Sequence, residues 1–159
     1  GVHVSGSPFN ASFAAAPQAA VASKSVLLTT SPWSATVGSD VPVVVQARDV
    51  RGIDVIVGGA ATTIAFDGTL REVRDGGNGQ YSSTITHTRA GSYSVEVMIG
   101  GAPIENSPQT LVLRPTTTDV SRCTVFTSDG TFVATAGKSA DFFITARDRF
   151  SNVQSYASA

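Results

Sequence analysis

Apolar side chains between residues 22 and 114 mostly recur at every second position, which is the period of a β-strand. Gly, Pro, Asp or Asn interrupts this alternation roughly every eight to twelve residues, as turns between short strands do. One face of such a strand takes a run of apolar residues: Val41, Val43, Val45 and Ala47. Polar residues lie on the other face, so the pattern predicts strands that each pack one side inward.

Seven strands are predicted in this way, at residues 26–28, 41–47, 62–66, 70–73, 81–85, 93–99 and 111–113. This number and spacing indicate an all-β protein, an immunoglobulin-like β-sandwich of about seven antiparallel strands. Its predicted core combines aliphatic and aromatic side chains: Val43, Val45, Ile64, Phe66, Tyr81, Tyr93, Val95 and Val97.

Tyr93 stands two residues before the inward Val95, which is the spacing of a tyrosine corner, where the hydroxyl bonds to upstream backbone. Val95 occupies the position at which antibody domains have a cysteine. Cys123 is the single cysteine of the chain, so no internal disulfide can form. We therefore expect packing alone to hold the sandwich together.

Segments of the sequence recur with a period near 99 residues. Ala47-Arg48-Asp49 returns as Ala146-Arg147-Asp148, and residues 101–108 repeat the Gly, the aliphatic and the Ser-Pro of residues 1–8. A period of this length predicts tandem repeats. We expect the C-terminal strand of a preceding repeat in residues 1–16, a linker in 17–21, a complete repeat in 22–114, and the N-terminal strands of an incomplete following repeat in 115–159.

Three motifs stand in a fixed order along the chain. Residues 73–81 read Val-Arg-Asp-Gly-Gly-Asn-Gly-Gln-Tyr, residues 101–108 read Gly-Ala-Pro-Ile-Glu-Asn-Ser-Pro, and residues 146–152 read Ala-Arg-Asp-Arg-Phe-Ser-Asn. They are similar to the V-x-D-x-x-x-G-x-Y hairpin, the G-x-x-I-x-x-S-P strand entry and the A-x-D-x-x-G-N turn of filamin-type repeats. Ser151 takes the glycine position of the last motif. The chain thus resembles tandem filamin-type immunoglobulin-like repeats.

This resemblance implies a partner-binding groove beside the third and fourth strands, at about residues 60–66 and 70–74. A partner segment would add there as an extra strand, because the third strand has no Pro or Lys to discourage pairing. The candidate residues are Ala61, Thr62, Thr63, Ile64, Ala65, Phe66, Leu70 and Glu72. The alternative is that a neighbouring repeat covers the groove, so the expected partners are other proteins and adjacent repeats.

Composition and charge argue against several classes of function. The 159 residues include 11 Lys+Arg and 12 Asp+Glu, which leaves no basic stripe for nucleic acid. No apolar run approaches the roughly 20 residues of a membrane helix, so we expect no membrane insertion by this segment. The two histidines, His3 and His87, fall in different repeats and are interpreted as surface residues. We expect no enzyme, no metal and no cofactor, and we interpret the aspartates as turn formers.

These observations predict a non-catalytic structural and protein-interaction module within a cytoskeletal or ciliary scaffold. The alternative is an extracellular cell-surface adhesion protein, suggested by the few charges, the abundant Ser and Thr, and the glycosylation acceptor Asn10 in Asn10-Ala11-Ser12. The unpaired Cys123 favours the scaffold. An accessory module of a carbohydrate-active enzyme would need exposed rows of aromatic residues, which the few Trp and Tyr of this chain do not supply.

Overall fold

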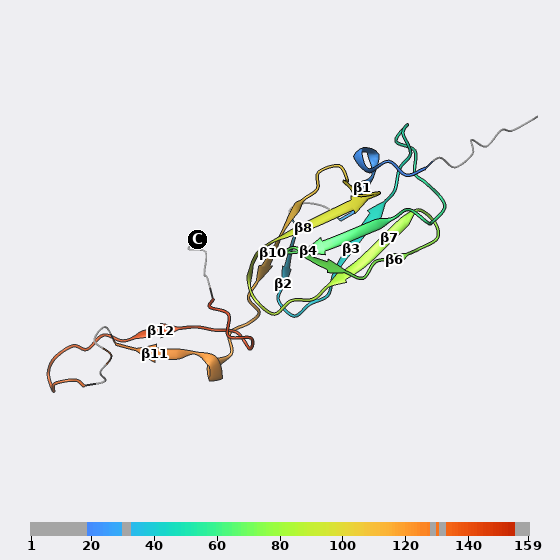
Figure 1. Cartoon of the computed structure of the whole chain (residues 1–159). Helices are drawn as coiled ribbons and strands as arrows, with labels where there is room; N and C mark the ends of the chain where they lie inside the picture. The colour runs from blue at the N-terminus through green and yellow to red at the C-terminus, as the bar shows by residue number, and fades with distance from the viewer. Residues whose placement is uncertain (1–18, 30–32, 128–129, 131–132, 155–159) are drawn as a thin grey trace, which may run out of the picture.

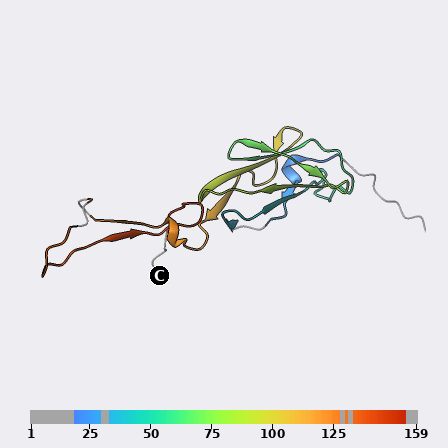
Figure 2. The ribbon, with the colours of Figure 1, turned by 90° about the horizontal axis from the view of Figure 1, so that it is seen from below.

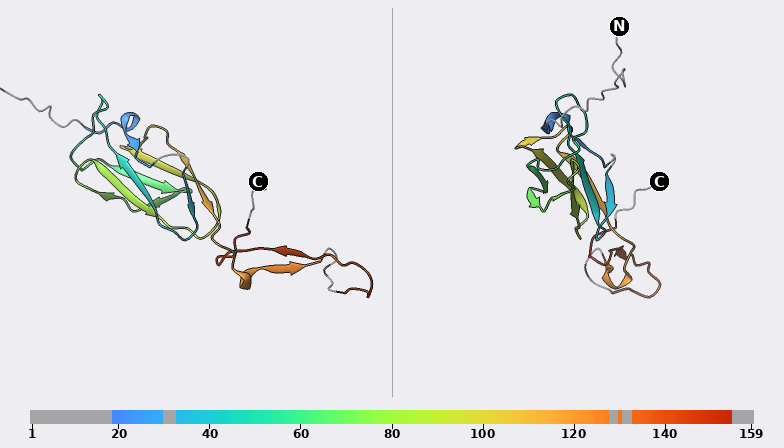
Figure 3. Two further views of the ribbon diagram at one scale, coloured as in Figure 1. Left: turned by 180° about the vertical axis from the view of Figure 1, so that it is seen from behind. Right: turned by 90° about the vertical axis from the view of Figure 1, so that its right-hand side faces the viewer.

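The computed structural model describes residues 19–29, 33–127, 130 and 133–154. Its strands between residues 26 and 114 form two sheets that lie face to face (Figures 1 and 3). The first sheet has the order β1 (Val26–Leu27), β3 (Val41–Gln46), β7 (Gln80–Ile85) and β6 (Arg74–Asp75). The second has the order β2 (Ser34–Thr36), β10 (Gln109–Arg114), β8 (Gly91–Ile99), β4 (Thr62–Phe66) and β5 (Thr69–Arg71), and β9 (Ala102–Pro103) pairs with β8. The prediction of an all-β, immunoglobulin-like sandwich is confirmed.

The N-terminal part of the repeat contributes one edge strand to each sheet. β1 pairs with β3 in the first sheet, and β2 pairs with β10 in the second. The β2–β10 pair is parallel, whereas the sequence predicted antiparallel strands throughout. The predicted strand at residues 70–73 is replaced by two short strands, β5 and β6, that belong to different sheets. Both differences concern edges, where the apolar alternation is short.

The core lies between the two sheets and matches the predicted inward faces. Val43, Val45 and Ile64 are fully buried, and Phe66, Tyr81, Val95 and Val97 are at most 2% exposed. Tyr93 is the exception, because it is half-buried and packs against the margin of this core. The core also includes Trp33, Ile85 and Leu111, which the sequence pattern did not assign to it.

A two-stranded hairpin of β11 (Thr124–Phe126) and β12 (Phe143–Thr145) follows the sandwich and extends from one end of it (Figure 2). Its register repeats that of β1 and β3, because Val125 faces Ile144 as Leu27 faces Val45, 98 and 99 positions earlier. Phe142 and Ile144, which correspond to the buried Val43 and Val45, are 64% and 61% exposed. These apolar side chains are therefore exposed in the hairpin, whereas their counterparts in the sandwich are buried.

The 3₁₀ helix at the start of the sandwich has a counterpart just before this hairpin. A short 3₁₀ helix, η1 (Ala22–Lys24), precedes β1, and η2 (Val120–Arg122) precedes β11 at the same spacing. The predicted strand at residues 1–16 lies outside the described residues, and of the predicted linker only residues 19–21 are described. The proposed boundaries of the repeats thus stay a prediction.

Candidate interaction surfaces

The predicted partner groove centres on β4, but β4 is not an edge strand. It lies between β8 and β5, and Ala65 faces Glu96 on one side and Leu70 on the other. The turn to β5 consists of Asp67 and Gly68, with φ of +48° and +75°. Positive φ at both central residues is typical of the tight hairpin turns that Asp-Gly favours. The expectation that residues 61–66 form an open edge of the sheet is therefore wrong. The Asp-Gly turn folds β5 against β4, so both sides of β4 are paired.

The strand at this margin of the sheet is β5, which has three residues. Leu70 is 71% exposed, and the Arg71 guanidinium lies 5.2 Å from the centre of the Phe66 ring. Arg71, Glu72 and Arg74 border a hollow of about 500 Å³ against β7. Leu70 and Glu72 are thus accessible, whereas Ile64 and Phe66 are buried in the core. Addition of a partner strand stays a prediction, and β5 is the strand that can accept it.

The tyrosine corner forms as predicted. The Tyr93 hydroxyl donates to the Arg89 carbonyl at 2.9 Å and lies 3.1 Å from His87 Nε2. The His87 ring also makes edge contacts with Phe66 and Tyr93, at centroid distances of 5.4 and 4.8 Å. His87 is half-buried, so its interpretation as a solvated surface histidine is wrong. Its role is to help fix residues 87–90, which connect the two sheets.

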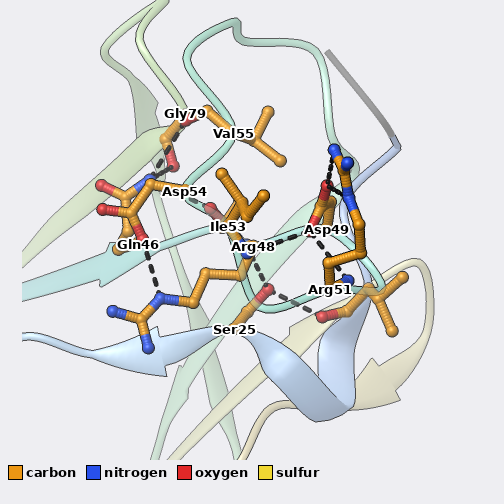
Figure 4. Close-up of polar contacts among 11 residues, drawn as sticks. Ser25, Gln46, Arg48, Asp49, Arg51, Ile53, Asp54, Val55 and Gly79 are labelled. Carbon is orange, nitrogen blue, oxygen red and sulfur yellow. Dashed lines mark hydrogen bonds and ion pairs between the residues drawn. The ribbon is translucent and has the colours of Figure 1, made fainter. Parts of the chain in front are cut away.

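The Asp49 carboxylate organises the turn that follows β3 (Figure 4). Its Oδ1 accepts hydrogen bonds from the Arg51 and Ile53 backbone N–H groups, each at 2.9 Å. The Arg51 guanidinium bonds to Oδ2 at 3.1 Å, and Gly52 has a φ of +78°. Asp49 is 3% exposed, so this carboxylate is a buried structural group, as its interpretation as a turn former predicts.

The same turn recurs 99 residues later at Asp148. Its Oδ1 accepts hydrogen bonds from the Phe150 and Asn152 backbone N–H groups, each at 2.9 Å. Ser151 has a φ of +68°, so it occupies the conformation of Gly52 although it is not a glycine. The repeat in the sequence is thus also a repeat of local structure.

The pKa of the Asp49 carboxyl is lower than its ordinary value of 3.8. Burial alone would raise this pKa, but the hydrogen bonds from the Ile53 and Arg51 backbone and from the Arg51 side chain outweigh burial. The pKa of Asp148 is lowered in the same manner, where burial is opposed by bonds from Asn152, Thr116 and Phe150. Both carboxylates therefore favour the folded chain when they are ionised.

We expect an acid-sensitive contribution to stability from Asp49. Because its folded pKa lies below the unfolded one, this contribution is complete above about pH 4 and is lost as pH falls through the folded pKa. The difference in unfolding free energy between the parent chain and Asp49→Asn should be constant from pH 7 to 5 and shrink by pH 3. Urea titrations at these pH values measure it, and a difference that stays constant down to pH 3 would refute the assignment.

The described residues contain neither a candidate metal site nor a helix that could span a membrane. Within residues 19–29, 33–127, 130 and 133–154, no three His, Cys, Asp or Glu side chains gather where they could hold a metal ion. The helices in these ranges are too short to cross a membrane. His3 and the acceptor Asn10 lie outside the described residues, so glycosylation of Asn10 stays a prediction.

The sandwich, its duplicated turn and the following hairpin define an immunoglobulin-like repeat protein. The family model of invasin domain 3 matches residues 7–115, so the chain belongs to that family. No curated protein sequence matches the chain.

Solved structures agree with this fold. Invasin, described as a bacterial integrin-binding protein, superposes with a TM-score of 0.62 and 22% identity over 87% of this chain and 29% of its own. The Escherichia coli adhesin FdeC gives 0.58 and 17% identity over 84% of this chain and 43% of its own. The filamin domain of Lin-41 gives 0.50 and 24% identity over 60% of this chain and 96% of its own. The chain thus spans less than half of the two bacterial proteins.

The comparisons refine the predicted class. They support an immunoglobulin-like repeat but do not single out a filamin repeat, because the matching family is an invasin domain. They support a non-catalytic adhesion or interaction domain. The extracellular alternative is better supported than the cytoskeletal or ciliary scaffold, because the family that matches is an invasin domain.

Proposed function

We propose that this chain is a tandem immunoglobulin-like segment of an invasin-type adhesin that works outside the cell. The observation that supports it most is the family match across residues 7–115. Such repeats act without catalysis: they separate a binding surface from its anchor and bind other proteins or adjacent repeats. Partner proteins would bind by strand addition at β5, where Leu70 is accessible.

The path of the chain suits a spacer. It reaches the sandwich at Val21, whose N–H donates to the Arg48 carbonyl at 2.7 Å, and leaves from β10 at the opposite end (Figure 3). The nine-residue β8 spans this length, roughly 30 Å at about 3.3 Å per residue. Repeats joined end to end in this way would form a rod, and each repeat would lengthen it by at least roughly 30 Å.

Surface exposure on the native cell tests the proposal. We expect an antibody against the central sandwich to label intact cells that produce the protein, with no gain after permeabilisation. An antibody against a cytoplasmic protein of the same cells serves as the control and should label only permeabilised cells. If the sandwich antibody labels the cells only after permeabilisation, the protein is not an extracellular adhesin. The intracellular scaffold would then be the favoured hypothesis.

A further inference from the structure

One side chain of the Asp148 turn, Asn152, makes a pair of hydrogen bonds to the sandwich. Asn152 Nδ2 donates to the Thr88 carbonyl at 2.8 Å, and Asn152 Oδ1 accepts from the Ala90 N–H at 2.8 Å. Both ends of the amide are therefore used, and a side chain of another shape could not satisfy both backbone groups. The bonds join the following segment to the connection between β7 and β8, more than 60 positions earlier in the chain.

A second contact from the same turn is apolar. The Phe150 ring packs against the margin of the sandwich core, over Gly38. A Cβ atom at Gly38 would lie 2.6 Å from Phe150 Cζ, so only glycine allows the ring to approach this closely. The Arg149 guanidinium lies 4.7 Å from the centre of the Phe150 ring, and one of its nitrogens would lie 3.3 Å from a Cβ atom at Gly38.

Each half of this joint is also held by hydrogen bonds of its own. On the sandwich, Tyr93 holds the Arg89 carbonyl, and the Gly38 N–H donates to the His87 carbonyl at 2.8 Å. On the turn, Asp148 Oδ2 accepts from the Thr116 N–H and from Asn152 Nδ2, each at 3.0 Å. The contact thus joins two ordered surfaces and loses little conformational freedom when it forms.

The central repeat has the same turn with different side chains. At the positions of Phe150 and Asn152, 99 residues earlier, it has Arg51 and Ile53. Ile53 is 53% exposed and has no amide with which to pair two backbone groups. The backbone of the turn is therefore common to both repeats, whereas the docking chemistry is found in only one of them.

We propose that Asn152 and Phe150 lock the following repeat onto a socket formed by Gly38, Thr88 and Ala90. The side chain at the Asn152 position then decides whether two successive repeats keep one orientation or hinge about residues 115–117. An asparagine gives a fixed joint, and the isoleucine of the central repeat's own turn does not. The proposal concerns coupling between repeats and holds whether or not the protein is an adhesin.

The test measures orientation in the whole chain. Spin labels are attached at Thr84→Cys on the exposed side of β7 and at Val120→Cys on η2, where Val120 is 85% exposed. Cys123→Ser removes the native thiol, and the equivalent position of the central repeat, before β1, is naturally Ser25. We expect a narrow distance distribution in this parent, a broad one in Asn152→Ile, and an unchanged one in the matched control Ile53→Asn.

Asn152→Ile could broaden the distribution merely by unfolding the Asp148 turn. A substitution in the socket, on the sandwich side of the joint, distinguishes this outcome from loss of the lock. Gly38→Ala places a Cβ atom against the Phe150 ring but leaves the sequence of the Asp148 turn unchanged, and it should also broaden the distribution. Gly68→Ala is its control, because Gly68 has a similar φ of +75° and open space around it. Exchange of the Ala90 amide, read by NMR, should be roughly tenfold faster in Asn152→Ile, since the Asn152 Oδ1 acceptor is removed. A distribution as narrow as the parent's in Asn152→Ile or Gly38→Ala, or a broad one in either control, would overturn the lock.

Discussion

Replacing Val95 by Asp should unfold the central sandwich. Val95 lies in β8 between β4 and β10, faces Phe66 and Gln109 on these neighbours, and is 1% exposed. An aspartate there would bury a carboxyl group among apolar side chains with no partner for its charge. The expected loss is several kcal/mol, comparable with the roughly 5 to 15 kcal/mol that stabilise a domain of this size.

The neighbouring position provides the control for this prediction. Ser94 is exposed on the opposite face of the same strand, so Ser94→Asp adds the same charge without burying it. Circular dichroism and urea titration of the whole chain should show an unfolded Val95→Asp variant and a Ser94→Asp variant close to the parent. Cooperative melting of Val95→Asp at the parent's temperature would show that β8 does not face the core as described.

The sequence predicted the core well because strand periodicity maps directly onto burial. Where two or more inward residues alternate, as in β3, β4 and β8, the buried face is the predicted one. The pattern did not predict the pairing of β5. The strand predicted at residues 70–73 overlaps this three-residue strand, but its alternation is too short to show that it pairs with β4. The Asp67-Gly68 pair was the available indication, since Asp-Gly is a strong predictor of a two-residue hairpin turn. Recognising it would have moved the predicted edge from β4 to β5.

The joint between the repeats could not be predicted from its motif. The sequence identifies the turn at residues 146–152, but an asparagine gives no indication of which distant backbone groups it will bond. Thr88 and Ala90 become its partners only because the sandwich ends there and Tyr93 fixes that connection. The difference between Asn152 and Ile53 is visible in an alignment of the two repeats, whereas its consequence depends on the three-dimensional structure.

Gly79→Ala should be the most damaging glycine-to-alanine substitution among the glycines that the structure describes. A Cβ atom at Gly79 would lie 1.8 Å from the Val55 carbonyl oxygen, so the backbone itself must move. That oxygen accepts a hydrogen bond from Gln46 Nε2 at 3.1 Å, and Gln46 also bonds to the Ala47 and Gly79 carbonyls (Figure 4). The buried Gln46 thus joins three segments, and displacement of Val55 breaks their connection.

The expected cost of Gly79→Ala is roughly 3 to 5 kcal/mol, which combines the strain of alanine at positive φ with the steric overlap. Gly77→Ala separates these two causes, because Gly77 lies in the same turn with a φ of +73°, close to the +79° of Gly79, but has no atom within 4 Å. Its cost should be only the backbone strain, about 1 kcal/mol. Urea titrations of both variants measure the difference. Equal losses would mean that the approach of Gly79 to Val55 contributes nothing, and that φ alone explains why glycine occupies this position.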